Sequence, residues 1–168
     1  MNISKIYFDM DGVLADFDQG VVDMLGLPYP NLYHETVENS DRMWHAIREY
    51  DHFYYNLAPR EGAVELFRIV HDRYGDQCQI LTGIPKPRRN IPEAGPDKIE
   101  WARKYLCPDV IVNVVLREEK INFCKGLDHV LIDDFRHNTD AWRYHGGLAV
   151  DHVDAERTLQ ELKNLNIL

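Results

Sequence analysis

The chain has 168 residues, 45% of them hydrophobic, and a net charge of -9 at pH 7. This length suits one domain with a substantial core. The acidic balance, without a long basic block, argues against a surface for DNA or RNA polymers. No apolar stretch is long enough to span a bilayer. We expect no membrane association, no signal peptide at an N-terminus that enters a strand directly, and a cytoplasmic location.

The cysteines and histidines do not predict a metal site. Cys78, Cys107 and Cys124 are widely spaced and odd in number. We interpret them as buried thiols of a reducing cytosol. The eight histidines are scattered without paired ligand spacing, so a zinc site is not expected.

The first predicted element is a short strand that ends in two aspartates one residue apart. Its β-branched and aromatic run, residues 6–8, is typical of a strand covered on both faces. Asp9 then lies at the strand end, Asp11 follows, and Gly12 allows a sharp turn close to an anion. Two neighbouring carboxylates suit Mg²⁺. A bare Asp-x-Asp is more often only an acidic turn, so downstream residues must decide between the two interpretations.

The segment after this strand predicts a small helical cap. Residues 17–58 are rich in aromatics and too long for an ordinary connection. Helices are expected at 18–25 and 40–50, the second capped by Ser40. We therefore predict a core of residues 1–16 and 59–168 with a cap of residues 17–58 inserted after the first strand.

Strands and helices alternate through the rest of the chain. This alternation predicts an α/β fold, a Rossmann-like parallel sheet with helices on both faces. The expected order is a helix at 62–74, a strand ending at 82, a helix at 98–106, a strand at 110–116, a helix at 118–124, a strand ending at 133, a helix at 139–144, a strand at 148–150 and a helix at 155–165.

Polar residues follow two of these later strands and open one helix. Thr82 and Gly83 end one apolar run, Asp133 and Asp134 end another, and Lys98 opens the helical stretch between them. Ligands of open parallel sheets bind outside the carboxyl ends of the strands. We therefore expect these groups to meet the first aspartate pair and to form a phosphoryl-transfer site.

These motifs resemble the haloacid dehalogenase-like (HAD) phosphatase superfamily. Residues 9–17, Asp-Met-Asp-Gly-Val-Leu-Ala-Asp-Phe, closely resemble the signature of its 5'(3')-deoxyribonucleotidases. The similarity continues through residues 53–59, 62–65, 82, 98–101 and 131–134. Three departures bear on the substrate: Gly83 stands where those enzymes commonly have serine, Phe135 stands where they have arginine, and the segment between Phe17 and Phe53 is shorter.

The resemblance implies a covalent mechanism. Asp9 would attack phosphorus and form an aspartyl-phosphate. Mg²⁺ would be held by Asp9, Asp134 and the backbone carbonyl of Asp11. Asp11 would also protonate the leaving oxygen and later deprotonate the attacking water.

The resemblance also assigns groups around the phosphate. Thr82, Lys98 and the amide near Gly83 would bind the phosphoryl oxygens. Asp133 would orient the loop or Lys98 rather than bind the metal. For Lys98 the alternative is an ordinary surface lysine, although a cation at a helix start opposes the helix dipole.

The cap aromatics have two interpretations. Phe17, Trp44, Phe53 and Tyr54 could stack on a nucleobase or form the small core of the cap. Phe17 is the best stacking candidate, because the resembling enzymes place a phenylalanine there against the base.

Two basic segments also have two interpretations. Residues 86–89, Lys-Pro-Arg-Arg, could be a solvated loop or could meet an incoming phosphate. Arg117 and Lys120 could line the entrance, but solvated side chains are expected.

The sequence therefore predicts a Mg²⁺-dependent phosphomonoesterase, a 5'(3')-nucleotidase of (deoxy)nucleoside monophosphates. Two alternatives stay open: a phosphatase of another small phosphomonoester such as a sugar phosphate, and a non-catalytic nucleotide-binding protein on the same scaffold. The intact Asp9, Asp11, Thr82, Lys98 and Asp134 favour an enzyme. Monomer and homodimer are both compatible with the sequence.

Overall fold

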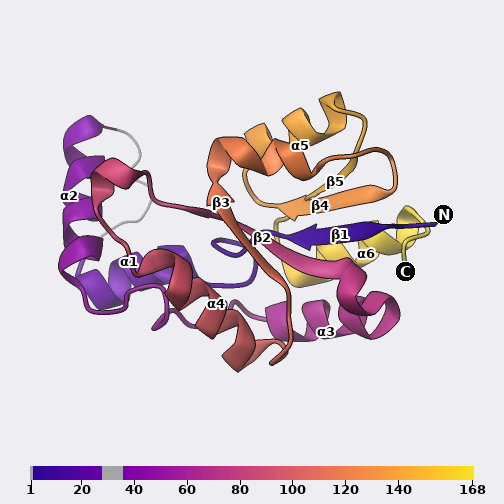
Figure 1. The fold of residues 1–168 in the computed structure, drawn as a ribbon. Helices are drawn as coiled ribbons and strands as arrows, with labels where there is room; N and C mark the ends of the chain where they lie inside the picture. Colours follow the sequence, from indigo (N-terminus) through magenta and orange to yellow (C-terminus); the bar gives the residue numbers. More distant parts are fainter. Residues whose placement is uncertain (1, 28–35) are drawn as a thin grey trace.

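A computed structural model describes residues 2–27 and 36–168. In this range five strands form one parallel sheet in the order β3-β2-β1-β4-β5 (Figure 1). The strands are β1 Lys5–Phe8, β2 Cys78–Ile84, β3 Val112–Leu116, β4 His129–Asp133 and β5 Leu148–Asp151. The predicted α/β fold with a parallel sheet is confirmed.

Helices cover both faces of this sheet. They are α1 Phe17–Leu25, α2 Val37–Glu49, α3 Ala63–Tyr74, α4 Ala94–Tyr105, α5 Arg136–Tyr144 and α6 Ala155–Asn164, with 3₁₀ turns η2 Gly75–Gln77, η3 Pro87–Arg89 and η4 Arg117–Phe123. Side chains of a strand alternate between faces. On β1, Phe8 packs against Phe67 of α3 in the larger core, and Tyr7 packs against Trp142 of α5 in the smaller one.

The central strand β1 marks the point where the chain changes direction across the sheet. Ile6 pairs with Cys78 of β2 on one side and with Val130 of β4 on the other. The chain first builds the β2–β3 side and then crosses to build the β4–β5 side. In such sheets a crevice for ligands opens at the carboxyl end of the strands at this switch point. The residue that follows β1 there is Asp9.

Helices α1 and α2 lie beyond the carboxyl end of β1, and both chain termini lie toward the opposite end (Figure 1). The Asp16 side chain caps α1 through the Gln19 amide at 3.2 Å. The predicted cap Ser40 of the next helix is wrong, because Thr36 caps α2 and starts it earlier. The cap of residues 17–58 stays a prediction, and its residues 28–35 lie outside the described residues.

Two other predicted boundaries need correction. Lys98 does not open its helix, because α4 begins at Ala94. Pro96 falls in the first turn of α4, where a missing N–H breaks no helical hydrogen bond. Thr82 lies inside β2, which continues to Ile84.

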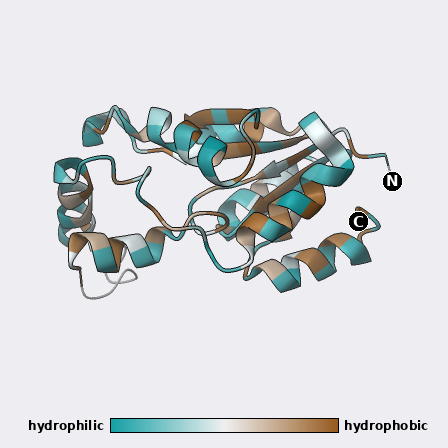
Figure 2. Ribbon diagram, turned by 90° about the horizontal axis from the view of Figure 1, so that it is seen from below, coloured by the Kyte–Doolittle hydropathy of each residue, from teal (hydrophilic) through white to brown (hydrophobic). Residues whose placement is uncertain are grey.

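Apolar residues concentrate along the strands, whereas polar residues recur along the helices (Figure 2). Among the described residues, no helix combines the length and apolar character needed to cross a bilayer. The three cysteines are free thiols. Cys78 is buried as expected, but Cys107 and Cys124 are only partly buried.

Candidate active site

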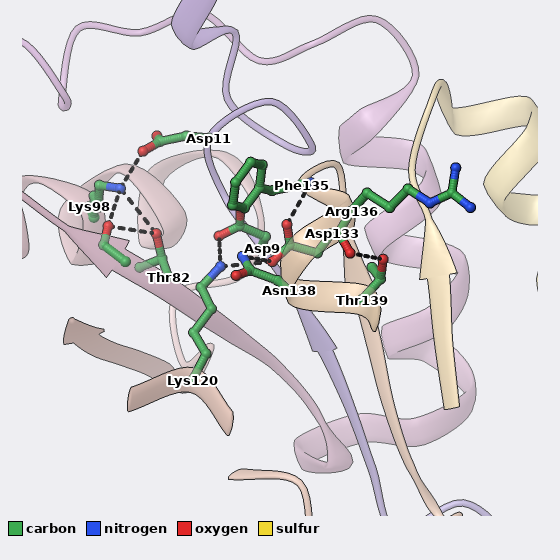
Figure 3. Close-up of polar contacts among 11 residues, drawn as sticks. Asp9, Asp11, Thr82, Lys98, Lys120, Asp133, Phe135, Arg136, Asn138 and Thr139 are labelled. Atoms are coloured by element: carbon green, nitrogen blue, oxygen red, sulfur yellow. Dashed lines mark hydrogen bonds and ion pairs between the residues drawn. The ribbon is translucent and has the colours of Figure 1, made fainter. Parts of the chain in front are cut away.

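Asp9 lies at the carboxyl end of β1, next to a buried lysine. The Asp9 amide donates to the Ile132 carbonyl at 2.9 Å, which ties the residue to β4. Lys120 Nζ lies 2.7 Å from Asp9 Oδ1, as an ion pair outside hydrogen-bonding geometry, and donates to Asp133 Oδ2 at 2.9 Å (Figure 3). Burial by itself lowers the pKa of Lys120, but the two carboxylates outweigh it and raise the pKa above its ordinary value. Lys120 is therefore a charged lysine held against the candidate nucleophile.

This position of Lys120 corrects the sequence interpretation. The residue is only 4% exposed and its side chain is not solvated. Residues three apart in a 3₁₀ turn lie on the same side, so Lys120 shares a side of η4 with Phe123. The Phe123 ring packs against Tyr7 of the sheet, 5.8 Å between centroids. Phe123, three positions after Lys120 in an otherwise charged run, was the sequence signal that could have predicted this burial.

Asp133 is fully buried and holds neighbouring groups in place. Its Oδ1 accepts a hydrogen bond from the Phe135 amide at 2.8 Å, and its Oδ2 accepts from both Lys120 and Asn138 at 2.9 Å. Asp133 thus bonds to the loop after β4 and to Lys120 rather than to Lys98, and its orienting role stays a prediction. The sequence pattern did not predict Asn138 as a residue of the site.

Asp134 packs directly over the glycine turn. A Cβ added to Gly12 would lie 2.1 Å from Asp134 Oδ2, and Gly12 has φ +80°. Both the close approach and the backbone angle therefore require glycine. Burial raises the pKa of Asp134 to about 7, and the charges of Asp9 and Asp133 add to the rise.

The donor set fits a hard divalent cation. Asp9, Asp133 and Asp134 each place one carboxylate oxygen within 4.8 Å of the others. Asp133 already accepts three hydrogen bonds, so Asp9 and Asp134 are the better ligands. Oxygen ligands of this kind suit Mg²⁺.

Asp11, Thr82, Gly83 and Lys98 meet on the other side of Asp9. Lys98 Nζ donates to Asp11 Oδ2 at 2.5 Å, to Thr82 Oγ1 at 3.0 Å and to the Gly83 carbonyl at 2.8 Å (Figure 3). An ammonium group has three donors, and this side chain is fully buried. The contact of Lys98 with phosphate stays a prediction, and it would require Lys98 to give up one of these bonds.

Burial has the largest effect on the Asp11 carboxyl. It raises the pKa of Asp11, the charge of Lys98 opposes the rise, and the charge of Asp9 adds to it. Asp11 Oδ1 is buried and has no hydrogen-bond partner among residues 2–27 and 36–168. That oxygen is free to interact with a bound molecule.

Asp9, Asp11, Gly83 and Asp134 open onto a cavity of about 510 Å³, whereas the fully buried Thr82 and Lys98 do not line it. Its lining includes Asp9, Asp11, Gly12, Phe17, Trp44, Tyr54, Gly83, Lys86, Arg88, Arg89, Arg117, Lys120, Asp134, Phe135 and Asn138. Three of the four predicted base-contact residues therefore reach the cavity. Phe53 does not line it and instead packs edge-on against Phe17, 5.7 Å between centroids.

Sequence comparison finds relatives that are named as nucleotidases. The chain is 27% identical over 146 residues to the mitochondrial 5'(3')-deoxyribonucleotidase of Mus musculus, covering 77% of this chain and 64% of the relative. It is 26% identical to the cytosolic-type 5'(3')-deoxyribonucleotidase of Homo sapiens, covering 77% and 70%. The chain thus spans less than two thirds of the mouse protein's length. No protein-family model matches the chain.

Solved structures with the same fold are HAD-type hydrolases. A dehalogenase with an intermediate complex aligns with TM-score 0.58 and 12% identity, over 98% of this chain and 97% of its own. A HAD family hydrolase from Deinococcus radiodurans, with bound phosphate and sodium, aligns with TM-score 0.53 and 14% identity over 88% and 80%. A HAD family enzyme from Bacteroides thetaiotaomicron, a magnesium complex, aligns with TM-score 0.50 and 13% identity over 90% and 94%. The chain has a HAD-like fold.

Aromatic and basic side chains pair at the wall of this cavity. Phe135, which follows Asp134, is 45% exposed at the cavity and lies under the guanidinium of Arg117, 5.1 Å from its ring centroid. Arg89 bridges to Asp41 at 2.5 Å and lies 5.5 Å from the Trp44 ring centroid. The basic loop that contains Arg89 therefore faces the cavity.

Proposed function

We propose that this chain is a Mg²⁺-dependent phosphomonoesterase, a 5'(3')-nucleotidase that dephosphorylates (deoxy)nucleoside monophosphates. The observation that carries this proposal is the position of Asp9. Its carboxylate ends the central strand, lines the cavity and lies 2.7 Å from the buried Lys120 ammonium. The similarity to the proteins named 5'(3')-deoxyribonucleotidase supports the choice of substrate.

Asp9, Asp134 and the backbone carbonyl of Asp11 would hold the Mg²⁺. The carboxylate oxygens within 4.8 Å of one another support this assignment, as does the magnesium complex of a HAD family neighbour. When bound, the ion supplies positive charge that neutralises the phosphoryl oxygens and fixes their orientation.

Asp9 acts as the nucleophile. One carboxylate oxygen forms a bond to phosphorus while the bond from phosphorus to the ester oxygen breaks. Water then attacks the phosphorus of the aspartyl-phosphate, which releases orthophosphate and restores Asp9. Lys120 at Oδ1 holds the carboxylate in place, so the second oxygen is available for the attack.

Asp11 exchanges protons with the substrate and with water. It donates a proton to the leaving oxygen and later accepts one from the attacking water. Burial raises the pKa of Asp11, which favours the protonated form needed first. The 2.5 Å bond from Lys98 holds Asp11 Oδ2 and leaves the unpartnered Oδ1 for this transfer.

The cavity suits a mononucleotide. Pockets for small ligands usually range from roughly 300 to 1,000 Å³, and this one measures about 510 Å³. Phe17, Trp44 and Tyr54 provide flat apolar surfaces on its wall. Phe17 already stacks on Tyr54, at 6.2 Å and an interplanar angle of 29°, and it is the residue we assign to the base.

Phosphate release from a panel of nucleoside monophosphates and other phosphomonoesters tests the activity. We expect Mg²⁺-dependent turnover that a chelator removes, and loss of turnover in Asp9→Asn with an unchanged fold. Asp109→Asn, an exposed aspartate away from the cavity, is the matched control and should keep full activity. Beryllium fluoride should attach to Asp9. Activity of more than a few per cent in Asp9→Asn would contradict the covalent mechanism.

Phe17→Ala tests the nucleotide assignment separately from the chemistry. A base–aromatic stack is worth roughly 1–3 kcal/mol, so kcat/KM for a nucleoside monophosphate should fall by about ten- to a hundredfold. Hydrolysis of a small aliphatic ester such as glycerol 2-phosphate should change little. Equal losses on both substrates, together with a lower Tm, would overturn the nucleotidase assignment and leave a phosphatase of unknown substrate.

A further inference from the structure

Three cations on the wall of the cavity have no ionic partner. Lys86, Arg88 and Arg117 line the cavity and are exposed. None of them forms an ion pair within residues 2–27 and 36–168. The chain has 28 acidic and only 19 basic residues, so three unpaired cations at one site need a physical reason.

The three cations follow neighbouring strands of the sheet. Lys86 and Arg88 lie just after β2, and Arg117 lies just after β3. These strands are adjacent and parallel, so their carboxyl ends meet at one edge. The three cations therefore lie at the same edge of the sheet as Asp9 after β1 and Asp134 after β4. All of these residues line the same cavity.

The space beside these cations continues into a second cavity. A second cavity of about 480 Å³ lies along η4 and α5, and five residues line both cavities: Lys86, Arg117, Glu118, Lys120 and Asn138. Lys120 is already bound to Asp9 and Asp133. Lys86 and Arg117 therefore mark a junction with room for a part of the substrate other than the phosphate at Asp9.

Arg117 is fixed in a way that suits an anion. Its guanidinium lies 5.1 Å from the centroid of the Phe135 ring, a cation–π contact that limits its rotamers. A guanidinium presents its donors as a planar fork that matches phosphate. Arg89, in contrast, already pairs with Asp41. Asp18 and Glu118 also line the cavity, but neither forms a recorded ion pair with the three cations.

We infer that Lys86, Arg88 and Arg117 bind a second phosphate, carried by the leaving alcohol of the substrate. This inference rests on the proposed function. The substrate class is then a phosphomonoester with two phosphates on separate hydroxyls, such as a nucleoside 3',5'-bisphosphate. Hydrolysis consumes one water, releases one orthophosphate from the ester at Asp9, and leaves the second phosphate on the product alcohol.

The test compares two substrates that differ only in the second phosphate. Deoxythymidine 5'-monophosphate and deoxythymidine 3',5'-bisphosphate are each assayed for kcat and KM, with the product identified by chromatography. Because charge-assisted contacts to phosphate are strong, kcat/KM for the bisphosphate should exceed that of the monophosphate by about tenfold or more. The preference should come mostly from a lower KM.

The triple variant Lys86→Gln, Arg88→Gln, Arg117→Gln should lose that preference. The control triple variant Arg73→Gln, Lys125→Gln, Lys163→Gln removes the same charge from exposed positions outside both cavities and should keep it. All six side chains are exposed, so both variants are expected to fold, as circular dichroism will check.

Three other results would overturn the second-phosphate site, and one of them would also overturn the proposed function. Equal kcat/KM values for the two substrates in the wild type would overturn the second-phosphate site and leave the proposed function standing. An equal loss on both substrates in the first triple variant would also overturn it, because that result describes general attraction of anions. Failure of the wild type to hydrolyse either substrate would overturn the proposed function, and the inference with it.

Discussion

Replacement of Gly12 by alanine should disable the metal site without unfolding the protein. Two separate costs can be worked out from the structure. Gly12 has φ +80°, and a left-handed backbone costs an L-residue roughly 1–2 kcal/mol. The new Cβ would also lie 2.1 Å from Asp134 Oδ2 and 2.7 Å from its Cγ, so the carboxylate must move. Loss of even an outer partner weakens a metal site about 10–100-fold, and displacement of a ligand should cost at least as much.

Gly146→Ala separates the two costs. Gly146 has φ +84°, but a Cβ there meets nothing within 4 Å, so this variant carries only the backbone penalty. In denaturant titrations without metal, Gly146→Ala should lose about 1–2 kcal/mol of unfolding free energy, and Gly12→Ala should lose at least as much because its Cβ also displaces Asp134. In calorimetric titrations with Mg²⁺, only Gly12→Ala should bind more weakly. Wild-type affinity in Gly12→Ala would refute the assignment of Asp134 as a metal ligand.

Three other variants test groups around the site. Lys120→Met should abolish phosphate release and lower unfolding free energy by about 3–5 kcal/mol, because it leaves two buried carboxylates without their cation; an active, equally stable variant would refute this role. His152, bonded to Thr158 Oγ1 at 2.8 Å, has its pKa lowered to about 4 by burial. The unfolded chain therefore binds more protons than the folded chain between pH 6.5 and 4. The neutral imidazole contributes up to about 3 kcal/mol of stability, which is fully present above pH 6.5 and should be lost as pH falls to 4. In denaturant titrations, His152→Gln should flatten this dependence of unfolding free energy on pH. Trp101→Phe should cost about 1–3 kcal/mol, measured as unfolding free energy, because the buried Leu57 carbonyl loses the 2.8 Å bond from the indole N–H.

The strands of the fold were predictable because local signals mark them. The apolar runs before Asp9, Asp133 and the end of β2 are short, continuous and followed by polar or turn residues. Helix starts were harder to predict. A proline can occupy the first turn, as Pro96 does in α4, and a threonine outside the apolar pattern can cap a helix, as Thr36 does.

The candidate site was predictable only in part, because charge in a sequence does not reveal burial. Lys120 stands in a run of charged residues that resembles a solvated turn, yet the 3₁₀ geometry of η4 directs it to Asp9. The sequence predicts a phosphate-binding role for Lys98, but its bonds to Asp11 and Thr82 depend on the packing of α4 against the sheet. Such contacts join residues far apart in sequence, and local patterns carry no information about them.

The central place of β1 has a consequence for how the protein folds. The first strand to leave the ribosome finds its neighbours only when Cys78 and Val130 have been made. Pairings so distant along the chain are slow to form, since long loops must close first. A nascent or truncated chain without β4 would expose one side of β1 and would lack Asp133 and Asp134. Catalytic competence should therefore appear late in folding, and a ligand that bridges Asp9 and Asp134 would stabilise the finished chain selectively.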